Sequence, residues 1–357
     1  MDMISEGRAR VYLSKDVFYN PKMSSLRDIS VTFLKAVSAK NKRVLDATAA
    51  TGVRGIRYAL ESGAKEVTLL DMNRKAAKMA QKNVKLNKLR LKVINQSLQQ
   101  FASQHKGSFE FIDYDPFGSP APNIYDLMRI SWDGTILMIT ATDTAVLCGA
   151  HEAACVKIYG SKPLHNELCK EAGIRILLSY TARIASQFNF GIAPLLSISD
   201  MHYMRIFIRL DYGAKNAINS VKSTGFGTFC RKCYQFRFKT GIVAQIPEMC
   251  ENCGSKLEAF GALWLEKLHD NQTVSKMARI KGIPLISLIK EELDTPFFYS
   301  VPKITKNLHL PSVSHYKVME ALARKGKKAT ATQFDANSIK TDADSEEVIG
   351  IIRALSK

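Results

Sequence analysis

The sequence lacks any apolar run that approaches the length of a membrane-spanning helix, and it lacks internal repeats and low-complexity tracts. Met1 leads into the polar stretch DMISEGRAR, which has no apolar segment of the kind found in secretion signals. We therefore expect a cytoplasmic protein with no membrane anchor. Its 357 residues are 46% hydrophobic and 24% charged, which is an ordinary globular balance and enough chain for two domains.

Acidic residues are scarce relative to basic ones. The chain has 33 Asp and Glu against 51 Lys and Arg, and its formal net charge is +18. Such an excess attracts a polyanion and speeds the encounter with it. A generally lysine-rich proteome would produce the same charge, so a nucleic-acid partner needs support from motifs. No feature of the sequence indicates an obligate protein partner.

Short apolar runs alternate with helical patterns from Lys42 onward, which predicts βα units and a parallel sheet. A long helix is expected over 164–188, followed by two strands that meet at a tight turn. An antiparallel hairpin at the end of a doubly wound sheet is typical of class I methyltransferases, an α/β, Rossmann-like fold. The expected strands are RVLDAT, EVTLLD, LKVIN, FEFIDYD, TILMITATD, PLLSISD and YMRIFIRL.

Three regions are predicted: a methyltransferase domain over 1–215, a cysteine-bearing connector over 216–260, and a C-terminal domain over 261–357. The segment KITKNL-HLP-SVSHYKVMEALARKG indicates a helix, a turn and a second helix, with Ser312 or Ser314 as its cap and Gly326 at its end. The following KKATATQF is interpreted as a strand. The C-terminal domain is therefore expected to be a small α+β unit, with a winged helix as our interpretation.

The loop after the first strand, ATAATGVRG, is poor in glycine. A dinucleotide fingerprint needs three spaced glycines, whereas this loop has only Gly52 and Gly55. S-adenosylmethionine has no phosphate and makes no such demand. Asp46 would meet its α-amino group directly or through water, and Asp71, 25 residues later, would accept hydrogen bonds from both ribose hydroxyls. Both aspartates could instead merely terminate strands.

Other cofactor contacts are expected around the same loop. Arg27 and Arg54 are positive groups suited to the methionine carboxylate, although either alone is more often a surface arginine. The third strand continues into VINQSLQQ, which offers Ser97 and the backbone amide of Leu98 to the adenine.

The fourth strand ends in Asp115-Pro116-Phe117-Gly118, which is the most informative segment. An exocyclic amine on a purine is a poor nucleophile, so its methylation needs an acceptor for its N–H and a flat surface that holds the base in line. Asp115 supplies the acceptor and Phe117 the stacking face for a base taken out of its helix. Phe18 could enclose the base from the other side or be a core aromatic. Asp113 is a candidate second polar contact.

Two Cys-x-x-Cys pairs lie sixteen residues apart in the connector. Four thiolates at this spacing suit a closed tetrahedral zinc site, and two pairs of equal size argue against a redox motif. We therefore predict a structural zinc ion. The predicted ligands are Cys230, Cys233, Cys250 and Cys253, whereas Cys148, Cys155 and Cys169 are expected to be core thiols.

Several long strings together resemble the tRNA guanine-26 N2-dimethyltransferase family: FYNPKMSSLRDISV, DATAATGVRGIRYALE, FIDYDPFGSP, TATDTAVLCGAH and ELCKEAGIRILL. The resemblance covers the chain almost to its end. It implies transfer of two methyl groups to guanine N2 of tRNA, a class I N-terminal domain and a smaller tRNA-binding C-terminal domain. It also implies Arg27, Arg54 and Asp71 as cofactor contacts, Asp115 as the catalytic carboxylate, and Phe18 and Phe117 around the base.

Two alternatives stay open at this stage. The chain could methylate another base, such as adenine N6 in DNA or rRNA, because related strand-end motifs serve several amines. It could also be an inactive, zinc-bearing nucleic-acid-binding protein. The intact DPFG motif and the Asp46–Asp71 pair argue against inactivity.

Overall fold

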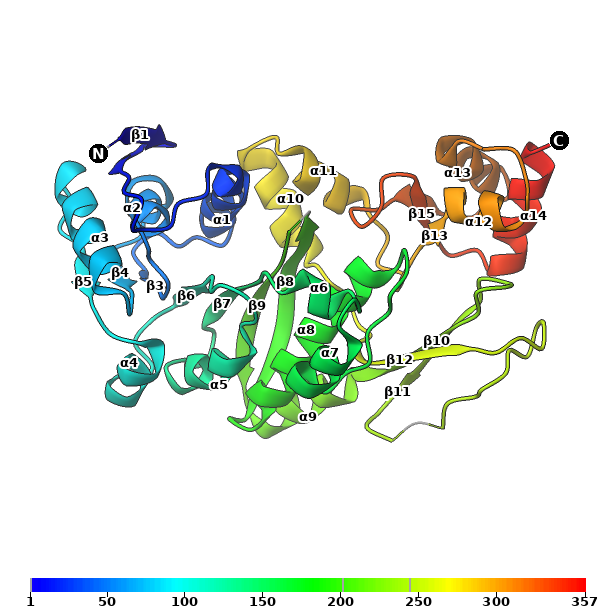
Figure 1. Cartoon of the computed structure of the whole chain (residues 1–357), viewed down its shortest axis with the longest axis horizontal. Helices are drawn as coiled ribbons and strands as arrows, with labels where there is room; N and C mark the ends of the chain where they lie inside the picture. Colours follow the sequence, from blue (N-terminus) through cyan, green and yellow to red (C-terminus); the bar gives the residue numbers. More distant parts are fainter. Residues whose placement is uncertain (1, 201, 244) are drawn as a thin grey trace.

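The computed structural model describes residues 2–200, 202–243 and 245–357. Its centre is a seven-stranded sheet in the order β5-β4-β3-β6-β7-β9-β8 (Figure 1). Neighbouring strands from β5 to β7 are parallel, whereas β9 pairs antiparallel with both β7 and β8. The expected parallel sheet and its antiparallel terminal hairpin are therefore present. The strands are β3 Arg43–Asp46, β4 Glu66–Leu70, β5 Lys92–Ile94, β6 Phe111–Tyr114, β7 Ile136–Ala141, β8 Phe190–Asp200 and β9 Tyr203–Tyr212.

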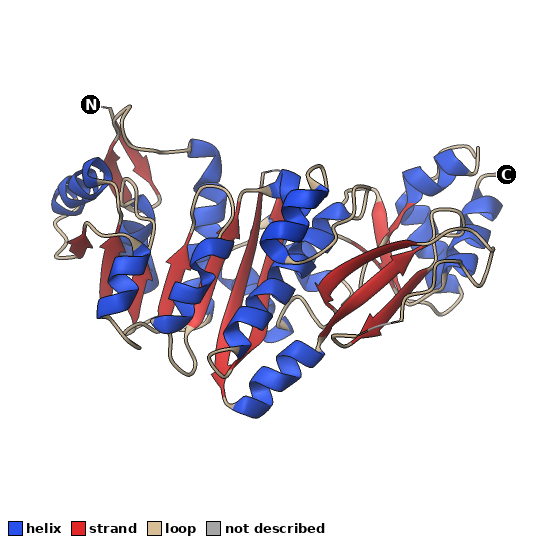
Figure 2. Cartoon of the chain, turned by 60° about the horizontal axis from the view of Figure 1, so that its bottom comes forward, coloured by secondary structure: helices blue, strands red, loops and turns tan. Residues whose placement is uncertain are grey.

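Alternate residues of the strands face two separate hydrophobic clusters, as a period of two requires. Val44 and Phe111 face a cluster that α1 covers, and Leu45 and Ile112 face a cluster that α4, α5 and α8 cover (Figure 2). The sheet is thus buried on both faces, so its strands are almost continuously apolar. These helices are α1 Ser24–Ala36, α4 Leu98–Gln104, α5 Ala121–Arg129 and α8 Cys169–Ser186.

The helix expected over 164–188 begins later, at Cys169. Asn166 explains the late start, because its side-chain and backbone oxygens accept hydrogen bonds from the amides of Leu168 and Cys169 at 2.9 and 3.1 Å. This turn satisfies donors at the start of the helix and fixes its first residue.

The remaining helices of the N-terminal region border the sheet and its loops. A β-hairpin of β1 Met3–Glu6 and β2 Ala9–Tyr12 precedes them and packs on α3. α2 continues directly into a π-helical turn, η2. The bounds are η1 Pro21–Met23, α2 Val53–Arg57, η2 Tyr58–Ser62, α3 Arg74–Leu86, α6 Thr144–Leu147, α7 Glu152–Tyr159 and α9 Ala214–Lys222.

The cysteine segment is built on a separate three-stranded antiparallel sheet in the order β11-β10-β12. Its strands are β10 Thr224–Phe229, β11 Phe236–Thr240 and β12 Glu258–Trp264. The boundary expected after residue 260 falls inside β12. One face of this sheet presents Phe236 and Phe238, which stack against Phe297 in the C-terminal region.

The C-terminal region contains a second small sheet, β13-β15-β14, bordered by helices on the side of the molecule away from β5 (Figure 1). A helix-turn-helix, α12 and α13, followed by β14 and β15, agrees with the winged-helix interpretation. The elements are α10 Asn271–Ile280, α11 Pro284–Glu291, β13 Tyr299–Ser300, α12 Val301–Asn307, α13 His315–Arg324, β14 Ala329–Ala331, β15 Ser338–Thr341 and α14 Ser345–Leu355.

Two features attach the C-terminal region to the large sheet. α10 and α11 complete the cluster beneath α1 through Val274, Met277 and Ile286. Glu171 of α8, which is fully buried, forms a 2.8 Å ion pair with Arg175 and a 3.2 Å ion pair with Lys340 of β15. No helix in the described ranges is long and apolar enough to cross a membrane.

Candidate active site

A cavity of about 810 Å³ lies at the carboxyl ends of β3, β4 and β6, where ligands bind in open α/β sheets. It brings together most of the residues that the sequence singled out for cofactor and catalysis. The predicted residues that line it are Phe18, Arg27, Arg54, Asp71, Leu98, Asp115 and Phe117, whereas Asp46 and Ser97 are outside its lining.

Asp115 follows β6 immediately and projects into this cavity. Its backbone N–H donates to Thr48 Oγ1 at 2.9 Å, which fixes the turn against the loop after β3. Its carboxylate forms a short ion pair with Arg54, a residue that is itself almost fully buried. The arginine thus places a positive charge directly beside the Asp115 carboxylate, in a cavity that Phe18 and Phe117 also line.

Phe18 and Phe117 are the aromatic pair beside Asp115, and both are exposed, at 55% and 75% of their surface. Their rings contact each other edge to face, with centroids 4.7 Å apart and planes at 81°. Exposed apolar rings at the mouth of a cavity are available to stack on a flat ligand. For a base to lie between them, the two rings must separate.

The Asp-Pro-Phe-Gly turn is held by residues that sequence reasoning did not assign. The Gly118 N–H donates to Thr142 Oγ1 at 2.7 Å, and the Thr142 N–H donates to the Gly118 carbonyl at 3.0 Å. Tyr159 and Ser119 share a 2.7 Å hydrogen bond, and the Tyr159 hydroxyl also donates to Asp143 at 2.9 Å. The TATD string at the end of β7 was the available signal for Thr142 and Asp143.

Asp113, the hypothetical second polar contact, is fully buried beneath the site rather than open to a ligand. Arg205 donates to its Oδ2 at 2.6 Å, and Arg54 and Tyr58 donate to the same oxygen. Burial alone would raise the pKa of Asp113, but Arg205 and Arg54 outweigh it and hold that pKa below its usual value. Asp113 is therefore an ionised anchor for the two arginines.

Asp46 is buried behind the loop that follows β3. Its Oδ2 accepts a hydrogen bond from the Gly55 N–H at 3.0 Å, and within the described chain its Oδ1 has no hydrogen-bond partner. Burial and the nearby Asp113 raise the pKa of Asp46 to about 7. Its position supports the start of α2 rather than the surface of the cavity.

Asp71 follows β4 and lines the cavity. One carboxylate oxygen accepts from the Ala50 N–H and the other from the Asn73 N–H, each at 2.8 Å. These bonds orient the carboxylate and leave further lone pairs on both oxygens. Leu98 lines the cavity nearby, whereas Ser97 caps α4 in a reciprocal pair with Gln100.

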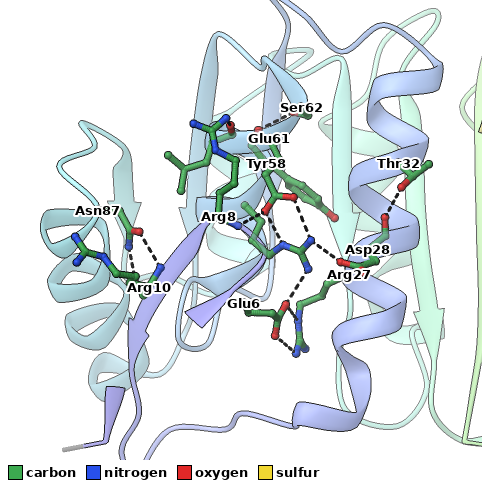
Figure 3. A network of polar contacts seen from close by, with 12 residues as sticks. Glu6, Arg8, Arg10, Arg27, Asp28, Thr32, Tyr58, Glu61, Ser62 and Asn87 are labelled. Atoms are coloured by element: carbon green, nitrogen blue, oxygen red, sulfur yellow. Dashed lines mark hydrogen bonds and ion pairs between the residues drawn. The ribbon is translucent and has the colours of Figure 1, made fainter. Parts of the chain in front are cut away.

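Arg27 borders the cavity from α1, but much of its guanidinium is already bound. Its Nε donates to Glu6 Oε1 at 2.7 Å and its Nη2 donates to Glu6 Oε2 at 2.5 Å (Figure 3). Arg57 donates to the same Glu6, and it also pairs with Asp28 and Glu61. This network fastens the N-terminal hairpin to α1 and to the end of α2, and it fixes one wall of the cavity.

The four predicted zinc ligands come together at the end of the β10–β11 sheet. Their sulfur atoms all lie within 4.8 Å of one another, with 3.4 Å between Cys230 and Cys253 and 3.5 Å between Cys233 and Cys250. Four sulfurs at ~2.3 Å from one ion in a tetrahedron would lie ~3.8 Å apart. All seven cysteines are free thiols, so the set is available to a metal.

The fold and the cavity define the class: this is a class I methyltransferase fold with its ligand site at the carboxyl ends of the strands. A family model described as N2,N2-dimethylguanosine tRNA methyltransferase matches residues 2–353. The chain belongs to this family.

Relatives and solved structures agree with that family. A tRNA (guanine(26)-N(2))-dimethyltransferase of Thermococcus kodakarensis is 36% identical in an alignment of 372 positions, gaps included, that covers 95% of this chain and 96% of the relative. The counterpart from Pyrococcus horikoshii is 36% identical over 99% of this chain and 98% of its own length. The structure of Trm1 from Pyrococcus horikoshii with S-adenosyl-L-methionine superimposes with a TM-score of 0.91 at 34% identity, covering 98% of this chain and 99% of that chain.

Proposed function

We propose that this protein transfers two methyl groups in succession from S-adenosylmethionine to the exocyclic N2 amine of guanine 26 in tRNA. The observation that carries the proposal is that Asp115 and two exposed aromatic residues in mutual contact, Phe18 and Phe117, line one cavity of a chain that belongs to this family. The excess of basic residues supports a polyanionic substrate.

The residues of the cavity suit this cofactor. S-adenosylmethionine, when bound, supplies a methyl group on a positively charged sulfur, so the transfer itself needs no metal. Asp71 would accept hydrogen bonds from the ribose hydroxyls, since both of its oxygens retain lone pairs. Leu98 would offer its amide to the adenine from the cavity wall, and Ser97 would hold that amide in place as the cap of α4.

The amino-acid part of the cofactor is assigned to the arginines and to Asp46. Arg27 has two of its nitrogens bound to Glu6, while Nη1 has no hydrogen-bond partner among the described residues and is suited to a carboxylate. Arg54 is already paired with Asp113 and Asp115. It would therefore act on the methionine carboxylate of the cofactor through its charge. Asp46 would act through water or through Gly55, because it is buried beside the cavity.

Asp115 would hold the amine during transfer. Its carboxylate accepts an N–H of the guanine N2 group, which favours a lone pair directed at the methyl carbon. Phe117 and Phe18 would stack on the base once their rings separate, and would keep it in line for attack. Arg54, which is ion-paired with Asp115, would orient this carboxylate before the substrate arrives.

Structural zinc is the metal that the cysteine quartet suits. Four thiolates within bonding reach of one centre form a closed site with no open position for substrate, so the ion would stabilise the fold rather than take part in the transfer. The cation would also offset the mutual repulsion of four thiolates.

A methylation assay with nucleoside mass spectrometry tests the proposal. Purified protein is incubated with labelled S-adenosylmethionine and an unmodified tRNA, the same tRNA with adenine at position 26, a duplex DNA and an rRNA fragment. We expect N2-methylguanosine and then N2,N2-dimethylguanosine from the first tRNA only. Methylated adenine from any substrate, or equal methylation of the position-26 variant, would contradict the proposal.

A further inference from the structure

We infer that the outer face of the β11-β10-β12 sheet, beside the cysteine quartet, binds a single unpaired nucleotide of the RNA substrate. This site would be distinct from the cavity that holds Asp115. The inference rests on the proposed function for its ligand class, because it takes RNA as the substrate. We refer to this surface as the sheet-face pocket, lined by Phe226, Thr228, Gln235, Arg237, Lys239 and Met249.

The strand register places these residues on one face. Phe226 lies opposite Lys239, and Thr228 lies opposite Arg237, in the antiparallel pairing of β10 with β11. Directly opposed residues of an antiparallel pair point to the same side, and so do residues two apart along one strand. The intervening Phe236 and Phe238 face the C-terminal core instead. The aromatic residues of β11 therefore pack against the C-terminal core, and its cationic residues lie on the outer face.

Two residues that line the pocket each have a buried side-chain oxygen without a partner among the described residues. Thr228 is 4% exposed, and in the described part of the chain its Oγ1 has no hydrogen-bond partner. Gln235 Oε1 is also buried without a partner among those residues. A buried polar atom without a hydrogen bond costs free energy, so such atoms beside a cavity indicate where a ligand or water is bound. A hydroxyl and an amide oxygen together can meet both the donor and the acceptor edge of a base.

The size and shape of the pocket suit one base rather than a larger ligand. Its volume is about 260 Å³, below the 300–1,000 Å³ that is typical for drug-sized ligands. Phe226 lines the pocket together with the apolar residues Ile246, Pro247 and Met249. A flat ring in the pocket would therefore have an aromatic side chain and apolar side chains available for contact. Cys250 also lines the pocket and connects it to the quartet.

The charges around the pocket favour an anionic ligand backbone. Lys239 is exposed, and the side chain of Arg237 is 55% exposed. Arg237 shares a 3.2 Å ion pair with Glu251 at the surface, which is weak enough for a phosphate to compete with it. If the base of a nucleotide occupies the pocket, the phosphate on its ribose would lie among these cations.

Together these features select a nucleotide over other ligands. A purely apolar peptide side chain would leave Thr228 and Gln235 unsatisfied, and a free anion would make no use of Phe226. Sequence-tolerant recognition of single-stranded RNA combines a stacking ring with a cationic groove, which is the combination on this face. Guanine 26 itself would be bound in the cavity of Asp115, so the sheet-face pocket would bind a different, unpaired nucleotide.

Binding of a short RNA tests this inference without any methylation step. The full-length, metal-loaded protein is titrated with a fluorescently labelled tetraribonucleotide of mixed sequence, and its Kd is measured by anisotropy. Phe226→Leu keeps an apolar side chain but removes the stacking surface, and we expect roughly tenfold weaker binding. Thr228→Val keeps the shape and removes the hydroxyl, and we expect weakening by about two- to tenfold.

A matched control and a second measurement separate binding from folding. Tyr212→Leu removes a ring that is 59% exposed on β9, and it should leave the Kd unchanged. Metal content and thermal unfolding of the Phe226 and Thr228 variants should match the wild type. With tRNA as substrate, both variants should raise KM and leave kcat unchanged, because Asp115 lies in another cavity.

The outcomes distinguish this inference from the proposed function. If the wild type methylates tRNA but Phe226→Leu and Thr228→Val bind the tetraribonucleotide as tightly as the wild type does, the sheet-face pocket is not an RNA site. If an apolar peptide competes for the pocket and the tetraribonucleotide does not, the ligand class is wrong. If the wild type fails to methylate tRNA but its RNA affinity still depends on Phe226, the inference stands and the proposed function fails.

Discussion

Asp115 and Arg54 form the ion pair on which the proposed chemistry depends. Arg54 is buried and also contacts Asp113, so two carboxylates share one guanidinium, and Arg205 supplies a second cation to Asp113. A buried arginine without a carboxylate partner would be costly. In this arrangement Asp115 is ion-paired, while its side chain stays 19% exposed at the cavity.

Replacing Asp115 should stop methylation with little effect on the cofactor. In Asp115→Ala the amine loses its acceptor, and we expect turnover to fall by about 10²–10⁴-fold. Arg54 keeps Asp113 as a partner, so the affinity for S-adenosylmethionine should stay near the wild-type value. Single-turnover methylation and calorimetry measure the two quantities, with the exposed Asp133→Ala as control. Retention of more than about a tenth of wild-type turnover would rule out the assignment.

Asp71 should affect the cofactor instead of the transfer step. In Asp71→Ala the ribose hydroxyls lose a charged acceptor worth roughly 1.5–3 kcal/mol, so the Kd for S-adenosylmethionine should rise about ten- to hundredfold. The loop at Ala50 also loses an oxygen that binds its N–H, which works in the same direction. Calorimetry that finds an unchanged Kd would remove Asp71 from the cofactor site.

At the scale of elements, the β10–β11 hairpin and the cysteine segment depend on each other. The Cys230 N–H donates to the Gln235 carbonyl at 3.0 Å, and the Cys250 N–H donates to the Ser255 carbonyl at 2.8 Å, which closes two tight turns. These turns bring the thiols together at the end of the sheet. A metal ion would then cross-link the two Cys-x-x-Cys turns.

Removing the metal should therefore weaken tRNA binding and spare the cofactor. We predict one zinc ion per chain by elemental analysis, and its loss in the double variant Cys230→Ser, Cys233→Ser. The cofactor cavity lies on the large sheet, so S-adenosylmethionine should still bind. The KM for tRNA should rise, whereas Cys155→Ser, a buried thiol elsewhere, should keep both metal and KM. A metal-free preparation with full tRNA affinity would contradict the role given to zinc.

His269 contacts β8 and the loop after β14, and it should make stability sensitive to acid. It accepts the Ser197 N–H from β8 at Nδ1, at 3.2 Å, and its Nε2 lies 3.3 Å from Gln333 Nε2. Burial, with Lys340 and Arg175 nearby, lowers the pKa of His269 to about 3 from the usual 6.5. The unfolded chain then binds a proton more readily than the folded one, so this contribution to stability is lost as pH falls from about 6.5 to about 3.

Urea unfolding at several pH values measures this contribution. The free energy of unfolding of the wild type should fall more steeply on acidification than that of His269→Gln, and the difference should develop below about pH 6.5. His151→Gln, on the exposed start of α7, serves as the control. Parallel curves for the wild type and His269→Gln would exclude this account.

At the scale of the whole molecule, the proposed active site and the basic end of α13 belong to different regions of the chain. Glu171, Arg175 and Lys340 join those regions through buried ion pairs, and α10 with α11 completes the core beneath α1. Breaking a buried pair costs more than losing a surface one. A rigid connection of this kind would let an RNA that contacts α13 also reach Asp115 at a fixed distance.

The salt dependence of tRNA binding tests the role of the end of α13. Neutralising Arg324, Lys325, Lys327 and Lys328 should flatten the plot of log affinity against log salt, by somewhat under one unit for each phosphate that these side chains no longer neutralise. Arg324 pairs with Glu320 and Lys327 with Glu347, so we expect the pair Lys325→Gln, Lys328→Gln to carry most of the change. Lys215→Gln, Lys222→Gln on α9 is the control, and an unchanged slope in the four-site variant would contradict this role.

The sequence by itself determined the class of fold, the strand-end aspartates and the cysteine quartet. Each depends on local properties: alternating apolar residues, a carboxylate where a strand ends, and thiols at ligand spacing. Asp71 and Asp115 could be placed because strand ends of a parallel sheet meet at one edge. The long strings shared with a known family supplied the substrate expectation.

Only the tertiary structure decided the partners of the charged side chains. Asp113 looked like a second substrate contact, but Arg205, 92 residues away in sequence, turns it into a buried anchor. Arg27 looked free to bind a carboxylate, but Glu6 engages most of its guanidinium. The sheet-face pocket likewise exists only because β10 pairs with β11 in one register. The charge of a side chain can be identified from its own residue type, but its neighbours come from distant parts of the chain. These neighbours decide whether the side chain binds a ligand or stabilises the fold.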